Sequence, residues 1–300
     1  MQGGHSVRGR GHGTRLSKLT TIVPLVLNAL TLISIFMIVG LGLAIIFGLM
    51  NVINLAHGEF VTIGAFTLSF VQAMGGNYWM ALLLAPFVGA AVGYALERLV
   101  VQHLYTRPMA TILATWGVSL MIQQVLQIVF GSGPQQASGP IEGSVEFLGT
   151  SYPAYRLLLI SFAAVIIAAI VFVFRKTRFG LDLRAVIQDR DMAEAQGINT
   201  RRIYTIAFCA GAGIAAIAGV LIAPLTKVIA LMGASYLAPS FFVVIVGGAG
   251  SIAGVAAGSA VVGGLETLLN YQVPVTVSQA VVLVAAVVIV RFKPRGLIPA

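Results

Sequence analysis

One short stretch of this sequence gathers polar side chains inside an otherwise apolar run, and it does so at Asn51, Asn54, His57 and Glu59. Ionisable groups at membrane depth are costly, and they tend to mark transport paths. A helix broken at such a point also offers free backbone N–H and C=O groups to a solute. The stretch is therefore a candidate for the path of a small solute. A polar turn at the membrane surface, whose side chains cap two helices, explains the sequence equally well.

A second candidate is the glycine-rich stretch 246–254, which contains Gly248 and Gly250. Its Gly-x-Gly pattern superficially resembles a dinucleotide-binding loop, but the strand, turn and helix that such a loop requires are missing. We expect instead a second backbone break, paired with the first across two halves of the chain. Tight helix packing is an alternative of similar weight.

The third candidate is the loop 175–202, whose core at 181–197 predicts a short amphipathic helix. Gly197 is placed to end this helix, and Asn199 or Thr200 to cap the next one. A helix with both charge signs suits docking of a soluble partner, whereas the alternative is a solvated loop helix. Docking is favoured because acidic residues are concentrated here, and the charged candidates are Asp182, Arg184, Asp189, Arg190, Asp191 and Glu194.

Several kinds of chemistry have no residues to perform them. No lysine follows a glycine, so the chain lacks the Gly-Lys-Ser/Thr loop that binds nucleotide phosphates. No Ser/His/Asp or Cys/His set suggests catalysis, and the single cysteine, Cys209, lies in an apolar stretch with no metal-like spacing around it. We therefore expect neither an enzyme nor a bound cofactor or metal, and any ATP hydrolysis belongs to another subunit.

The elements that position these candidates are membrane helices. Hydrophobic residues make up 58% of the chain and charged residues only 9%, against roughly 25% charged in an average soluble domain. Apolar stretches long enough to cross a membrane, about 20 residues, lie near 22–38, 58–74, 80–101, 109–130, 155–174, 203–226, 254–270 and 277–291. Two shorter pieces near 41–50 and 236–248 are interrupted by glycine. The expected fold is an all-α, polytopic transmembrane bundle of about eight to ten segments, two of them glycine-broken or re-entrant.

Charge predicts how this bundle sits in the membrane. Residues 1–20 are expected to form a disordered basic tail in the cytoplasm, and residues 21–300 the transmembrane domain. With both termini, the 102–108 turn and the 175–202 loop in the cytoplasm, only Arg156 and Lys227 lie outside, which leaves 16 of the 18 basic residues inside. The 131–153 loop, which has no Lys or Arg, then falls outside, in agreement with the positive-inside rule.

Taken together, four stretches make the chain resemble the permeases of the hydrophobic amino acid uptake group of ABC importers. They are 48–60, the 181–197 loop, 247–254 and 293–297. The resemblance implies a multi-pass protein of the bacterial inner membrane that works with a second related permease, two cytoplasmic ATPases and a periplasmic or extracellular solute-binding protein. It also implies that 181–197 couples to an ATPase, with Ala193–Gly197 similar to the coupling-loop core of importers.

The substrate has more than one candidate within that group. The stretch 111–124, preceded by Arg107 and Pro108, looks like the urea-type branch, although Met109 and Ala110 depart from its pattern. The C-terminal third is closer to the general amino acid branch. We expect branched-chain amino acids, with urea or short amides as the alternative. A stand-alone channel or carrier for a small neutral solute is a further alternative, but it has no need of a charged cytoplasmic docking helix.

Overall fold

The computed structural model describes residues 10–105, 107–147, 150–294 and 296–298, with the side chains of 10–21 left out. The regular secondary structure of the described chain is helical apart from one small antiparallel hairpin, β1 (Ser144–Phe147) and β2 (Thr150–Pro153). The expected all-α class is therefore confirmed. The helices are α1 (Arg10–Met50), α2 (His57–Ala73), α3 (Tyr78–Leu99), α4 (Pro108–Phe130), α5 (Ala154–Lys176), α6 (Arg178–Gln188), α7 (Arg190–Ala195), α8 (Thr200–Ile222), α9 (Ala234–Gly247), α10 (Ile252–Asn270) and α11 (Val275–Phe292), with single 3-10 turns after α3 and α8.

Within the described residues, seven helices are long and apolar enough to cross a membrane. They are α1, α3, α4, α5, α8, α10 and α11, whereas α2 and α9 are shorter, at 17 and 14 residues. Large apolar side chains point outward from α4 and α11, including Leu113, Ile128 and Val284. Such surfaces suit hydrocarbon rather than water. The polytopic bundle is thus confirmed.

The first helix differs from the expectation of two separate pieces, because α1 runs without a break through Gly40 and Gly42. A Cβ atom at Gly42 would lie 2.6 Å from the carbonyl oxygen of Gly211 in α8. The glycine therefore allows two helix backbones to pack closely, and it does not interrupt the helix. The predicted segments 22–38 and 41–50 are one apolar span, Ile22–Met50.

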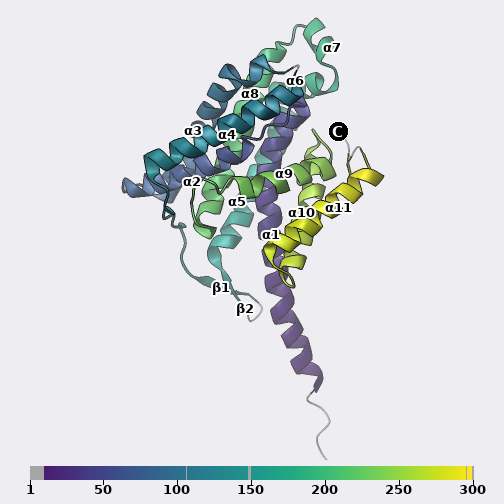
Figure 1. Cartoon of the computed structure of the whole chain (residues 1–300). Helices are drawn as coiled ribbons and strands as arrows, with labels where there is room; N and C mark the ends of the chain where they lie inside the picture. The colour runs from purple at the N-terminus through teal and green to yellow at the C-terminus, as the bar shows by residue number, and fades with distance from the viewer. Residues whose placement is uncertain (1–9, 106, 148–149, 295, 299–300) are drawn as a thin grey trace, which may run out of the picture.

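Merging two predicted segments into one changes the end of the bundle at which α1 starts. The start of α1 lies at the end of the bundle that carries β1 and β2, called the hairpin end below (Figure 1). There the Tyr152 hydroxyl of β2 lies 3.0 Å from Thr31 Oγ1 and 3.2 Å from Asn28 Oδ1 of α1. The last described residues, 296–298, lie toward the opposite end with α6 and α7, called the α7 end. The described ends of the chain thus lie at opposite ends of the bundle, which does not match the expectation that both termini share one side. Of the expected disordered tail, residues 1–9 lie outside the described residues, and the backbone is helical from Arg10.

The bundle is built from two halves that repeat one plan. The long helices α1 and α8 cross at its centre and run in opposite directions, and each is followed by an irregular stretch, 51–56 or 226–233. A shorter helix, α2 or α9, then starts inside the bundle. The starts of these two helices meet, because a Cβ atom on Gly58 would lie 2.6 Å from the Gly233 carbonyl oxygen. This is the arrangement of inverted repeats with broken helices. The chain also leaves helix at 248–251, between α9 and α10 and within the stretch 246–254 where a second break was expected.

Candidate functional site

The polar stretch begins where the chain leaves α1 and turns back into the bundle. Asn51 adopts a left-handed conformation, with φ of 50°, and its side chain is exposed. Asparagine tolerates this conformation better than most residues. Asn54 is fully buried, and its Oδ1 accepts a hydrogen bond of 3.0 Å from the Ala56 N–H. This bond folds residues 54–56 into the turn that starts α2.

Glu59 lies in the first turn of α2 with 2% of its surface exposed. Its Oε1 accepts hydrogen bonds from Ser119 Oγ, at 2.8 Å, and from Gln123 Nε2, at 2.7 Å. Its Oε2 has no partner among the described residues. Both donors come from α4, so a single buried carboxyl joins two membrane helices. A buried acidic group of this kind is a functional candidate in a membrane protein.

The matching face of α4 is a stripe of polar residues, Thr111, Thr115, Ser119 and Gln123, all buried on a helix whose other faces are largely exposed. Thr115 Oγ1 accepts a hydrogen bond of 3.1 Å from the Leu55 N–H, so the stripe also holds the irregular stretch before α2. Sequence reasoning missed this stripe as part of the site. The signal was present, since polar residues four positions apart share one face of a helix.

His57 is fully buried beside the middle of α1. Its Nε2 lies 3.2 Å from the Val39 carbonyl oxygen and donates to it, while Nδ1 has no partner among the described residues. Its ring meets that of Phe60 edge to face, with centroids 6.1 Å apart. The structure thus groups Asn54, His57 and Glu59 in the interior, which argues against the alternative of a turn at the membrane surface.

Gly248 and Gly250 lie elsewhere, in the turn between α9 and α10. Their φ angles of 116° and 79° are those that favour glycine. A Cβ atom on Gly48, near the end of α1, would lie 2.5 Å from the Gly250 Cα. The C-terminal residues close over this turn, because the Leu297 N–H donates to the Val246 carbonyl at 2.8 Å. These contacts match the alternative of tight packing.

The loop between α5 and α8 forms two helices, α6 and α7, where a single helix over 181–197 was expected. The break falls at Asp189, whose extended backbone ends α6 and whose carboxylate caps α7 by accepting from the Met192 N–H at 2.9 Å. Asp favours this capping role over the interior of a helix. The predicted ends are confirmed, since Gly197 has φ of 87° after α7 and Asn199 Oδ1 caps α8 at 3.0 Å.

The surface of α6 and α7 combines charge with exposed apolar side chains. Arg190 and Glu194 form an ion pair of 3.1 Å, and Thr200 Oγ1 donates to the same carboxylate oxygen at 2.5 Å. These bonds hold the pKa of Glu194 below its ordinary value, so the carboxylate is charged at neutral pH. Leu181 and Met192 are 60% and 57% exposed. The other charged candidates are at least partly exposed on these helices: Asp182, Arg184, Asp189 and Asp191.

Comparison with known proteins gives a consistent result. A family model described as "Branched-chain amino acid transport system / permease component" matches residues 25–291. The high-affinity branched-chain amino acid transport system permease protein LivH of Salmonella typhimurium is 27% identical over 90% of this chain and 93% of its own length. BraD of Pseudomonas aeruginosa, named for the same transport system, is 25% identical over 90% and 94%. LivM of Escherichia coli, also named as a permease protein of such a system, is 26% identical over 74% of this chain and 58% of its own length.

Proposed function

The chain belongs to the family of branched-chain amino acid transport permeases, as its motifs predicted, and we propose that it carries branched-chain amino acids across the bacterial inner membrane within an ATP-driven importer. The observation that carries the proposal is the match of the family model to residues 25–291, which spans both halves of the bundle. The permease is not an enzyme, and ATP hydrolysis belongs to separate subunits.

The proposed partners are a second permease, two cytoplasmic ATPases and a soluble binding protein. Similarity to both LivH and LivM supports a pair of related permeases, because two permease proteins are named for one kind of transport system. The α6–α7 surface supports an ATPase contact, since it offers a charged and partly apolar face that the chain itself leaves exposed. Charged groups and apolar anchors on one rigid helix pair suit a partner surface.

The polar interior supports a role in the solute path. We place Asn54, His57 and Glu59 beside or within that path, because the starts of α2 and α9 meet there and leave backbone groups outside regular helix. Asn51 lies at the entrance to this stretch. Gly248 and Gly250 act by allowing α1, α9 and α10 to approach closely, which fixes the helix packing at the α7 end of the path.

The α7 end is the cytoplasmic side in this proposal. Eleven described basic residues from Arg98 to Lys293 lie at that end, whereas Arg156, Lys227 and the start of α1 lie at the hairpin end. The bias is weaker than the sequence suggested, because α1 begins at the hairpin end, but it keeps the same direction.

Cysteine labelling tests this orientation. In a Cys209→Ala background, Ser138→Cys at the hairpin end is expected to react with a membrane-impermeant thiol reagent in cells whose inner membrane is intact. Ser138 is suitable because its side chain is exposed and its backbone, not its hydroxyl, bonds to Gln72. Gln188→Cys at the α7 end should react only after the inner membrane is opened. The reverse pattern would overturn the orientation.

Competition between solutes tests the substrate. Cells that depend on this importer are expected to take up labelled leucine, and unlabelled valine or isoleucine should compete while urea should not. Competition by urea but not by valine would favour the urea or short-amide alternative. Uptake that continues without ATP would favour a channel or carrier.

A further inference from the structure

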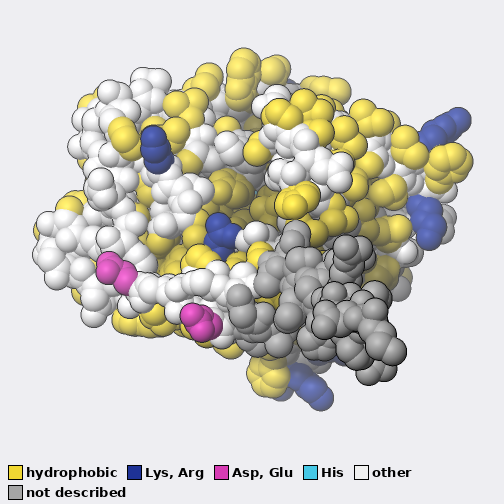
Figure 2. Space-filling view, turned by 90° about the horizontal axis from the view of Figure 1, so that it is seen from below, with side chains coloured by type: hydrophobic (Ala, Val, Ile, Leu, Met, Phe, Trp, Pro, Cys, Tyr) yellow, Lys and Arg dark blue, Asp and Glu magenta, His cyan; other side chains and the backbone are white. Residues whose placement is uncertain are grey.

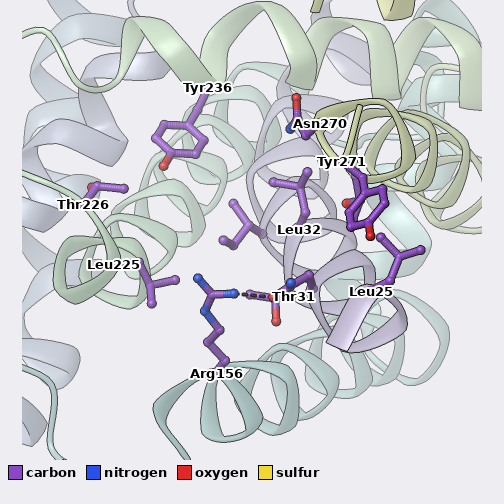
Figure 3. Close-up of a pocket in the computed structure, with 12 residues that line it drawn as sticks. Leu25, Thr31, Leu32, Arg156, Leu225, Thr226, Tyr236, Asn270 and Tyr271 are labelled. Carbon is purple, nitrogen blue, oxygen red and sulfur yellow. Dashed lines mark hydrogen bonds between the residues drawn. The ribbon is translucent and has the colours of Figure 1, made fainter. Parts of the chain in front are cut away.

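A large cavity opens at the hairpin end, among α1, α5, α9 and α10 (Figure 3). Its volume is about 410 Å³, within the range of small-molecule sites. Viewed from that end, the molecule is hollowed, with a basic side chain inside the hollow and acidic side chains toward its rim (Figure 2). The polar residues that line the cavity are Asn28, Thr31, Arg156, Thr226, Tyr236, Thr267, Asn270 and Tyr271.

Arg156 supplies the charge of this cavity. It is the third residue of α5, and its guanidinium reaches toward the middle of the cavity, where it donates a hydrogen bond to Asn28 Oδ1 (Figure 3). Its Cζ lies 5.9 Å from the centre of the Tyr152 ring. Among the described residues, the only ion pair is that of Arg190 with Glu194. No carboxylate of the described residues therefore pairs with Arg156.

The electrostatics of this position are unfavourable without an anion. A guanidinium is charged at every physiological pH, and Arg156 is only partly exposed to solvent. It also stands in the first turn of α5, where the helix dipole is positive and disfavours a cation. Burying a charge costs free energy unless the charge is paired. Arg156 therefore presents to the cavity a positive charge with which a negative group can pair.

The other residues that line the cavity indicate which further groups the ligand has. Tyr236 lies across the cavity from Arg156 with its hydroxyl turned inward (Figure 3), and Asn270 and Thr226 add groups that can donate to a carboxylate or accept from an amino group. Leu25, Leu32 and Leu225 form apolar wall between the polar groups. A guanidinium fork fits a carboxylate with two parallel bonds.

We propose that this cavity is a binding site for the carboxylate of an α-amino acid, held by Arg156, with an apolar side chain against the leucines. The proposal rests on the proposed importer function in taking this end as the side on which solute enters. It adds a chemical requirement to that function, because urea and short amides have no carboxylate to offer Arg156.

Protection of a cavity cysteine from a thiol reagent tests the site in the purified permease complex without its binding protein. Thr226→Cys in the Cys209→Ala background places the thiol on the cavity wall. The probes are leucine and the matched pair 4-methylpentanoate and 4-methylpentanamide, which differ only in carboxylate against amide. Leucine and 4-methylpentanoate are expected to protect the thiol at concentrations about tenfold lower than the amide, the size of a lost charge-assisted bond. Equal protection by the pair, or none by any probe, would overturn the proposal.

Substitution of the arginine provides the second arm. Arg156→Gln should abolish the preference for carboxylate over amide, and Arg156→Lys should retain part of it, because it keeps the charge but lacks the fork. Lys227→Gln is the matched control, since Lys227 is exposed at the same end but does not line the cavity. An Arg156→Gln protein that keeps the full preference would also overturn the proposal. Leucine import by the unaltered complex is measured separately, so failure of the site and failure of the importer function give different results.

Discussion

Glu194→Lys is expected to lower leucine uptake about tenfold or more, because it reverses the sign of a charge within the proposed ATPase contact. The permease should still reach the membrane, and substrate-stimulated ATPase activity should fall together with uptake. The structure adds a second effect. Glu194 also bonds to Arg190 and to Thr200, so its replacement loosens the junction of α7 with α8.

Two further variants separate these effects. Thr200→Val removes the internal bond to Glu194 but leaves the exposed charges of α7 unchanged, so a small loss of uptake is expected. Met192→Glu leaves that junction intact and alters only a side chain that is 57% exposed, so it should disturb the contact strongly. Glu142→Lys, in the hairpin-end loop, is the charge-matched control. Normal uptake and normal ATPase copurification in both Glu194→Lys and Met192→Glu would show that the ATPase docks elsewhere.

Glu59→Gln is expected to lower uptake about tenfold, equivalent to about 1.4 kcal/mol, because it removes the acidic group from the proposed solute path, while leaving the permease in the membrane. The amide keeps an oxygen that can accept from Ser119 or Gln123, and its size is that of the carboxyl. The packing of α2 against α4 should therefore persist, and the change is one of charge. Uptake of labelled leucine, normalised to the amount of permease in the membrane, measures the effect.

Glu59→Leu should behave differently. It leaves the Ser119 hydroxyl without its acceptor inside the bundle, at a cost of about 1–3 kcal/mol, and leaves the Gln123 amide with only its longer bond of 3.3 Å to Ser119 Oγ. We expect a less stable permease, with a lower unfolding temperature in detergent. Glu146→Gln on the exposed strand β1 is the control for loss of an acidic charge. Full uptake by Glu59→Gln would show that Glu59 joins α2 to α4 and that its acidic group has no part in transport.

The membrane helices and the helix ends in the 175–202 loop could be predicted because each has a local cause. Apolar length decides whether a segment spans, and Gly197 and Asn199 act on backbone groups within a few residues of themselves. Asp189 was a signal of the same kind, since a short acidic side chain favours a cap over a helix interior, yet the expected single helix passed through it.

The errors arose where one residue type serves two purposes. Glycine permits both a break in a helix and the close packing of two helices. Which of the two occurs depends on the segment that packs against the glycine. Gly42 packs against Gly211, so α1 continues as one helix, and its start lies at the hairpin end. The glycines of 246–254 do end one helix and precede the next, whereas the irregular stretch 226–233 before α9 was missed, because only Gly233 marks it.

ATP-driven leucine import by the purified importer in proteoliposomes is the most direct test of the proposed function. The complex is this chain with the permease, ATPases and binding protein that copurify with it. Labelled leucine is supplied with the binding protein on one side and ATP on the other. We predict that leucine accumulates above its external concentration, that accumulation stops without ATP, and that it stops again when this chain carries Glu194→Lys. Accumulation that is independent of ATP, or a complete complex that imports no branched-chain amino acid, would contradict the proposed function.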